Sequence, residues 1–317
     1  MIVRWGPAEL PRTLEEVRIA RPLVIASARW QSLGIPHLAW WSEVPATDVE
    51  VPVEADGSVA VGGGSAVDTA KHASARSGKP VVHVPTTYSG AEWTTFYGIR
   101  SPDRIIRGGG AGARPVAIVY DVDLTLGLPR DQTAGTAMNA LAHCAEALYV
   151  RGHNPAADEH ALAGARLIAE WLPGVVAVPQ DLEARTELLR GACRGGAALA
   201  GSMLALAHAM AQAIGGRYGL PHGTLNGICL PPVLRFNADH APDAVARFGK
   251  AVGAPGDPAG RVEALTALAG PTRLGDLGVP EPDLPGLAAA AAERGGNLAN
   301  PKPASPDEIE QLLRAVY

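Results

Sequence analysis

Three histidines and one asparagine are spaced in a way that predicts a single reactive site. Asn139 and His143 lie four residues apart in AMNALAHCAEALY, and His208 and His222 follow downstream. On a helix, residues i and i+4 share a face, so Asn139 and His143 would point to the same place. Imidazoles bind divalent metals or hydrogen-bond a substrate oxygen, whereas a neutral amide is a poorer metal ligand than a carboxylate. We therefore expect a site for a substrate oxygen or a weakly held metal.

A second chemical signal is the glycine turn in SVAVGGGSAVDTAK. Gly62, Gly63 and Gly64 would let the backbone approach an anion closely. A helix that starts near Ser65 would present its free N–H groups to a diphosphate, and Ser65 could cap it. The order of glycines matches neither GxGxxG nor the P-loop, so a plain strand-to-helix turn is the structural alternative.

Polar residues follow the next apolar run, in PTTYSGAE. Thr86, Thr87 and Ser89 would lie just beyond the end of a strand, where open α/β sheets bind ligands. Their hydroxyls could contact phosphate, ribose or nicotinamide. A Ser/Thr-rich loop with no ligand is the alternative.

The elements that must position these residues divide the chain into two parts. Residues 1–128 alternate strand and helix signals, which predicts an α/β domain with a parallel sheet. Residues 129–317 have long Ala/Leu-rich segments and no strand signal, which predicts an all-helical domain. The expected strands are Leu23–Ala28, 37–43, 58–61, 80–87 and 115–121, and the expected helices are 131–150, 156–173, 182–212 and 285–294.

Composition restricts the classes of function. The chain has 317 residues and a net charge of −5, which gives no sign of a nucleic-acid partner. Cys144, Cys193 and Cys229 form neither a CxxC motif nor a disulfide framework, so a reducing compartment fits best. No stretch predicts a signal peptide or a membrane span, and we expect a cytoplasmic protein that acts on a small molecule.

Taken in order, these motifs resemble the iron-containing alcohol dehydrogenase family. VYDVDLTLGLP, HAMAQAIGG, LPHG and NPKP complete the series, which runs from about Val59 to the C-terminus. Within the family the chain is most similar to the maleylacetate reductases. The resemblance implies a dehydroquinate synthase-like fold, with NADH or NADPH in a cleft between a dinucleotide-binding domain and a helical domain. It also implies a homodimer, and it adds Asp68 and Arg107 to the expected cofactor-binding residues.

The resemblance also bears on the metal. Metal-dependent members hold iron or zinc with an aspartate and three histidines, at places matched here by Asn139, His143, His208 and His222. Maleylacetate reductases also carry asparagine at the first place, and the resemblance implies that they need no metal. We therefore expect a divalent metal to be possible but not required.

The chain departs from the family pattern in several places. The region before the glycine turn is short, so a crossover helix is expected to be missing. Ala28 and Arg29 replace an aspartate typical of NAD-preferring relatives, which favours tolerance of NADPH. Gln212 stands where a second histidine is usual, and Asn226 where maleylacetate reductases have histidine.

The expected reaction is hydride transfer to a carbon–carbon double bond conjugated to a ketone, with Asn139 and the histidines around the developing enolate oxygen. Arg107, Arg217 and Arg235 are candidates to face a dicarboxylate substrate. Three alternatives stay open: a metal-dependent alcohol dehydrogenase acting on an aldehyde, a lyase of the dehydroquinate-synthase kind, and a binding protein without turnover. The lyase would need a lysine-rich phosphate pocket, and the helical segments carry almost no lysine.

Overall fold

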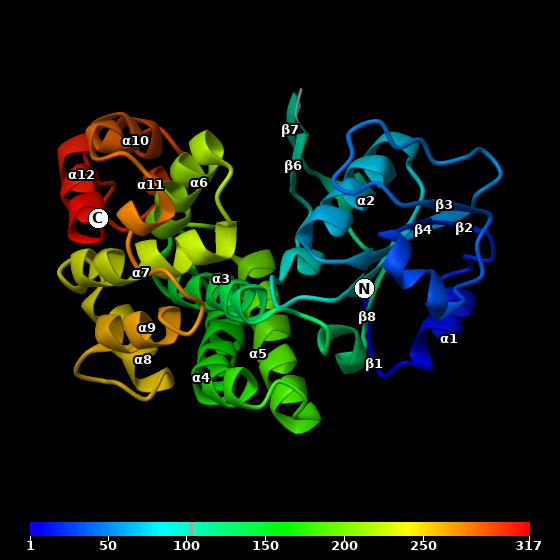
Figure 1. Ribbon diagram of the computed structural model, residues 1–317, viewed down its shortest axis with the longest axis horizontal. Coiled ribbons are helices and arrows are strands. Elements are labelled where there is room, and N and C mark those ends of the chain that lie inside the picture. The colour runs from blue at the N-terminus through cyan, green and yellow to red at the C-terminus, as the bar shows by residue number, and fades with distance from the viewer. Residues whose placement is uncertain (102–103) are drawn as a thin grey trace. The chain divides into compact units, whose positions relative to one another are not determined.

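A computed structural model describes residues 1–101 and 104–317 of the chain (Figure 1). The chain divides into two compact units. The α/β unit comprises Met1–Thr87 and Ala91–Gly127, and the helical unit comprises Tyr88–Gly90 and Leu128–Tyr317. The short segment Tyr88–Gly90 therefore belongs to the helical unit, which the pattern of the sequence does not reveal.

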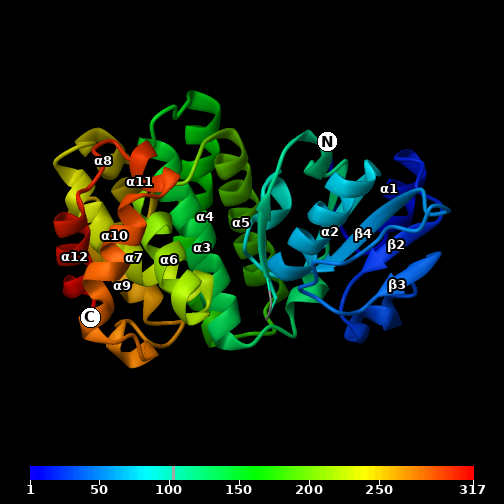
Figure 2. The same cartoon turned by 90° about the horizontal axis from the view of Figure 1, so that it is seen from above.

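The α/β unit is built on a six-stranded sheet with the order β1-β8-β5-β4-β2-β3, in which all neighbouring strands are parallel. Figure 2 shows β2, β3 and β4 side by side. The strands are β1 (Ile2–Trp5), β2 (Pro22–Ile25), β3 (Ala39–Trp41), β4 (Gly57–Gly62), β5 (Val81–Pro85) and β8 (Ala117–Tyr120).

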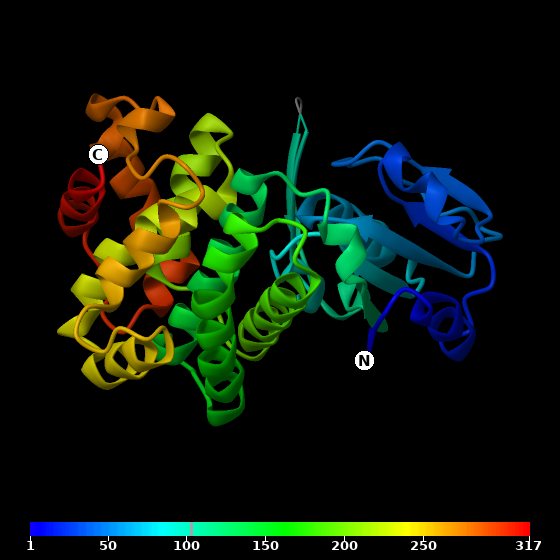
Figure 3. The same cartoon turned by 60° about the horizontal axis from the view of Figure 1, so that its bottom comes forward.

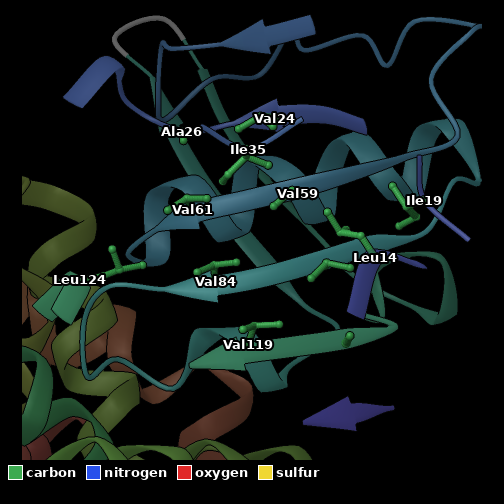
Figure 4. Close-up of a cluster of buried hydrophobic side chains, with 12 residues drawn as sticks. Leu14, Ile19, Val24, Ala26, Ile35, Val59, Val61, Val84, Val119 and Leu124 are labelled. Carbon is green, nitrogen blue, oxygen red and sulfur yellow. The ribbon is translucent and has the colours of Figure 1, made fainter. Parts of the chain in front are cut away.

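The central strands β4 and β5 are buried throughout and mostly apolar because both faces of the sheet are covered. Val59, Val61 and Val84 point to one face, where they join the cluster that includes Leu14 of α1 (Glu9–Glu16) (Figure 4). Ala60 faces the opposite side and packs with residues of α2 (Gly64–Ser77). This two-sided burial fixes the register of β4, and therefore the place at which the glycine turn leaves the sheet.

Several expectations for the α/β unit need correction. The strand expected over Leu23–Ala28 ends at Ile25, because Ala28 already begins a 3-10 helix, Ala28–Leu33. The edge strand β1 and the antiparallel hairpin β6 (Tyr97–Ser101) and β7 (Arg104–Gly108) were not expected; the hairpin extends away from the sheet (Figure 3). Residues 42–56, all of them described, form neither helix nor strand, which confirms the missing crossover helix.

The helical unit contains ten α-helices in the part of the chain that the structure describes. The expected helix 182–212 is in fact two helices: the first ends at Gly201 and the second begins at Leu206. The helices expected from the sequence also did not include α7 (His222–Ala238), whose interior contains two prolines. The helices are α3 (Arg130–Tyr149), α4 (Pro155–Ala177), α5 (Leu182–Gly201), α6 (Leu206–Tyr218), α7 (His222–Ala238), α8 (Pro242–Ala251), α9 (Pro258–Thr266), α10 (Leu284–Ala292), α11 (Gly295–Ala299) and α12 (Pro306–Ala315).

Helix α3 lies at the centre of this unit and is buried along most of its length, in contact with α4, α5 and α7. Glycines let its neighbours approach closely. A Cβ added at Gly195 of α5 would lie 2.7 Å from the carbonyl oxygen of Ala140, and one at Gly164 of α4 would lie 2.8 Å from the Cys144 Sγ. Because α3 carries Asn139 and His143, this close packing also fixes the position of those two side chains.

Among the described helices, none taken singly has both the length and the apolar composition needed to cross a membrane; α5 and α6, which meet at a bend of 99°, reach that threshold only as a pair.

The close packing around α3 predicts that Gly195→Ala lowers the free energy of unfolding by about 1–3 kcal/mol, because the new methyl group meets a backbone oxygen that cannot move independently. Gly174→Ala in α4 is the matched control. A Cβ there meets only the Ala184 Cβ, at 4.0 Å. This control should leave stability unchanged or raise it by about 0.4–1 kcal/mol. Denaturant titration of both variants measures the difference, and equal stabilities would contradict the packing argument.

Candidate active site

The glycine turn connects β4 to α2 at the carboxyl end of the sheet. A Cβ at Gly62 would lie 2.7 Å from the Ala66 Cβ, and one at Gly63 would lie 2.8 Å from the Thr87 Cγ2, so side chains at these two places would collide with their neighbours. Gly63 is the N-cap of α2 and, as a glycine, has no side chain with which to cap the helix. The first-turn N–H groups are therefore left for a ligand, and an anion is what they would attract.

The expectation that Ser65 caps this helix is wrong. The helix begins at Gly64, so Ser65 is its second residue, and its side chain is exposed. The carbonyl of Ser65 accepts a hydrogen bond from the Thr69 hydroxyl at 2.8 Å. An exposed hydroxyl in the first turn can still donate to a bound phosphate.

Two of the three hydroxyl residues after β5 meet the glycine turn. The Thr86 N–H donates to the Gly62 carbonyl at 3.0 Å, and Thr87 packs against Gly63. The Thr86 hydroxyl is buried and has no hydrogen-bond partner among the described residues. Ser89 lies instead in the helical unit, where its carbonyl accepts from the Asn139 amide at 2.8 Å.

Asp68 makes hydrogen bonds inside the α/β unit, and its expected contact with the cofactor stays a prediction. Its carboxylate accepts from Lys71 Nζ at 3.1 Å and from the Gly98 N–H at 3.0 Å. Burial lowers the pKa of Lys71, and the charge of Asp68 opposes this shift. Asp68 thus ties α2 to the β6–β7 hairpin. Arg107 is exposed on that hairpin, and the Arg29 guanidinium lies 4.6 Å from the centre of the Trp30 ring.

The three histidines come together in the helical unit, as expected. His143 on α3 and His208 on α6 are buried and stacked, with ring centres 4.8 Å apart and planes inclined by 15°. His222, the first residue of α7, is exposed, and its ring centre lies 5.5 Å from that of His208. Burial, followed by the neighbouring His208 and His222 rings, lowers the pKa of His143 well below its usual value, so this imidazole is neutral at pH 7.

Two asparagine side chains occupy the space beside these rings. Asn139 directs its amide nitrogen toward the Ser89 carbonyl and toward His143 Nε2, at 2.8 Å and 3.4 Å. Asn226 donates to Asn139 Oδ1 at 2.6 Å and lies 3.0 Å from His222 Nε2. The Asn139–His143 pair on α3 and the His222–Asn226 pair on α7 each have the i, i+4 spacing of a helix. In each pair the amide nitrogen faces a nitrogen of the imidazole ring.

Glu146 is a site residue that the sequence analysis missed. It is fully buried on α3, one turn from His143, and its carboxylate accepts the N–H groups of Ala205 at 2.7 Å and His208 at 3.1 Å. It also accepts from His208 Nδ1 at 2.6 Å. With a carboxylate as acceptor, Nδ1 carries the hydrogen and the ring is fixed, so that Nε2 is the nitrogen available to a ligand. The signal was present in the sequence, since Glu146 is the one acid in AHCAEALY.

The arrangement does not fit the metal site of the iron-dependent members. Among the described residues, no three His, Cys, Asp or Glu side chains are grouped to hold an ion. The rings of His143 and His208 are stacked and nearly parallel. The lone pairs of their nitrogens lie in the ring planes, so they do not converge on one ion. Amide N–H groups of Asn139 and Asn226 face the imidazole nitrogens that a cation would need.

Comparison with known proteins bears on both units. A model of the C-terminal region of the Fe-containing alcohol dehydrogenase family matches residues 133–317, and an iron-containing alcohol dehydrogenase model matches residues 20–127. The maleylacetate reductase of Burkholderia cepacia is 37% identical over 265 residues, which cover 83% of this chain and 74% of that protein. That of Sphingobium indicum is 37% identical over 288 residues, covering 90% of this chain and 81% of that protein.

The fold agrees with these matches. The crystal structure of maleylacetate reductase from Agrobacterium tumefaciens superposes with a TM-score of 0.89 at 29% identity, covering 100% of this chain and 96% of that one. The family models together span both units, and the relatives match most of the chain. The chain therefore belongs to the iron-containing alcohol dehydrogenase family, and it is an NAD(P)-dependent oxidoreductase.

Proposed function

We propose that this protein reduces a conjugated keto acid of the maleylacetate type with NADH or NADPH, and that it needs no metal ion. One observation carries the proposal: amide groups of Asn139 and Asn226 stand among the histidines, where a metal-dependent member would need converging lone pairs. The similarity to maleylacetate reductases over most of the chain supports the same substrate class.

In this proposal the α/β unit holds the cofactor. The uncapped first turn of α2 after Gly62–Gly64 receives the diphosphate, with Ser65, Thr86 and Thr87 as hydroxyl donors. Reduced nicotinamide supplies a hydride to the alkene carbon β to the ketone. The π electrons of the alkene then form a double bond to the ketone carbon, and the C=O π pair moves to the oxygen to give an enolate. A proton then adds to the α carbon, which gives the saturated keto acid.

The helical unit stabilises the negative charge that develops on this oxygen. Preorganised donors of this kind contribute about 2.7–4 kcal/mol each in comparable sites. His208 Nε2 is buried with no hydrogen-bond partner among the described residues, and Glu146 fixes the ring from the opposite side. We assign His208, when protonated, or a water beside it, as the source of the proton.

A metal-dependent alcohol dehydrogenase that acts on an aldehyde is the second candidate. The observation in its favour is the presence of three imidazoles in one cluster, with His143 Nδ1 and His208 Nε2 buried and without partners in the described chain. Movement of the amide groups would be required before these nitrogens could share an ion.

The first test is oxidation of NADH and NADPH by the purified protein, measured at 340 nm as an absorbance decrease, with maleylacetate or a simple aldehyde. We expect turnover with maleylacetate that is unchanged after dialysis against a chelator. Loss of activity that returns on addition of iron or zinc, together with a preference for the aldehyde, would establish the second candidate instead.

Asn139→Asp should increase the affinity for divalent metal, because an anionic oxygen compensates the charge of a cation where an amide cannot. We expect the wild-type protein to contain metal well below one equivalent after incubation with Zn²⁺ and desalting, and the variant to contain more. Metal analysis provides the readout, and Asn154→Asp at the N-cap of α4 is a control outside the site. Equal metal contents in wild type and Asn139→Asp would argue against this account.

Glu146→Gln should lower kcat by about 10²-fold, since general acid–base groups contribute this much or more and the ring of His208 loses its anionic acceptor, while one of the two accepting oxygens becomes an NH₂ donor. Equilibrium binding of NADPH should be retained, because Glu146 lies in the helical unit. Glu170→Gln, an exposed residue of α4, is the matched control and should retain wild-type kcat. A Glu146→Gln variant with normal kcat would show that the pair does not orient His208 for the reaction.

A further inference from the structure

We infer that Arg294 binds a carboxylate of the substrate and that Gln212 holds the arginine in position; this assignment rests on the proposed function. Arg294 precedes α11 and is half-buried. Its guanidinium donates from Nη1 to Gln212 Oε1 at 3.4 Å and from Nη2 to the Gln212 carbonyl at 3.2 Å.

Gln212 places this cation near the reactive histidine. Gln212 and His208 are both on α6 and are four residues apart, so they lie on one face of the helix, about 6 Å apart along its axis. A keto acid with a carboxylate a few bonds from its ketone spans a similar length. Such a substrate could contact His208 with its ketone oxygen and Arg294 with its carboxylate.

The type of each residue suits this role. Guanidinium presents a planar fork of N–H groups that matches a carboxylate, and it stays charged at all relevant pH values. The Gln212 amide orients the fork through a neutral oxygen, so it adds no negative charge that would compete with the substrate. Gln212, which departs from the histidine typical of the family, thus acquires a physical explanation.

The arginines expected from the sequence are less suited. Arg217 pairs with Asp283 at 2.9 Å, and Arg235 pairs with Glu263 at 2.7 Å. Both of these side chains are about half exposed, 50% and 53%. Both therefore lie on the surface of the helical unit, and Arg107 is exposed on the hairpin of the α/β unit.

Two variants test the assignment by different means. Arg294→Gln removes the charge. Gln212→Glu keeps the size and the hydrogen bond but adds a carboxylate that occupies the guanidinium. For both, we expect the KM for maleylacetate to rise tenfold or more, with a smaller change in kcat. Arg235→Gln removes a surface charge of the same unit and is the matched control, with an unchanged KM expected.

Melting temperature and the Kd for NADPH are measured for each variant, so that loss of fold is separated from loss of substrate binding. If Arg294→Gln does not fold, Gln212→Glu decides the question alone. Wild-type turnover of maleylacetate with a KM that Gln212→Glu leaves within twofold overturns the assignment of Arg294 only. Wild-type protein that reduces aldehydes but not maleylacetate overturns the proposed function, and the assignment with it.

Discussion

The buried carboxylate of Glu146 organises the helical unit around the reactive histidines. It lies on α3 with no exposure to solvent and accepts N–H groups from the start of α6, including the ring N–H of His208. A charge buried this deeply is strongly destabilising unless it is fully hydrogen-bonded, so the chain must deliver those donors. The break between α5 and α6 makes this possible, because it frees the Ala205 and His208 backbone N–H groups that a continuous helix would use internally.

The packing of α3 also fixes the positions of the polar side chains at the candidate site. Glu146, His143 and Asn139 all project from α3, which is held in place by close approach of α4 and α5 at glycines. The segment Tyr88–Gly90 completes this arrangement. Its Ser89 carbonyl accepts from Asn139, and a Cβ at Gly90 would lie 3.4 Å from His143 Nδ1. A rigid scaffold of this kind keeps donors aimed at a developing charge without reorganisation.

The candidate anion site of the α/β unit is formed by the backbone of the glycine turn. Its glycine turn offers backbone N–H groups rather than side chains, and the sheet holds the turn because β4 is buried on both faces. The Asp68 carboxylate, which joins Lys71 and the β6–β7 hairpin, contributes to this support. In the proposed function, binding of a diphosphate and stabilisation of an enolate therefore belong to two different units of the chain.

Short-range patterns in the sequence determined many of the secondary-structure elements and the side chains they carry. The alternation of apolar runs with helices, the glycine turn before α2, and the i, i+4 pair of Asn139 and His143 follow from short-range geometry, which neighbouring residues fix by themselves. The central strands β4, β5 and β8, the helices α3 and α4, and the histidine set were therefore predictable, whereas β1, the β6–β7 hairpin, the break between α5 and α6, and helix α7 were not. The N-cap position of α2 and the end of β2 were not predictable, because several adjacent residues satisfy the local pattern of an element end equally well.

Tertiary structure alone decided which distant groups meet. The contact between Glu146 and His208 joins residues 62 positions apart, and that between Asn139 and Asn226 joins residues 87 apart. Arg294 reaches Gln212 across 82 positions, and Asp68 of α2 reaches the Gly98 N–H of the hairpin across 30 positions. Such pairings depend on how whole helices pack against one another. The partners are far apart in the sequence, so no spacing rule in the sequence could specify them.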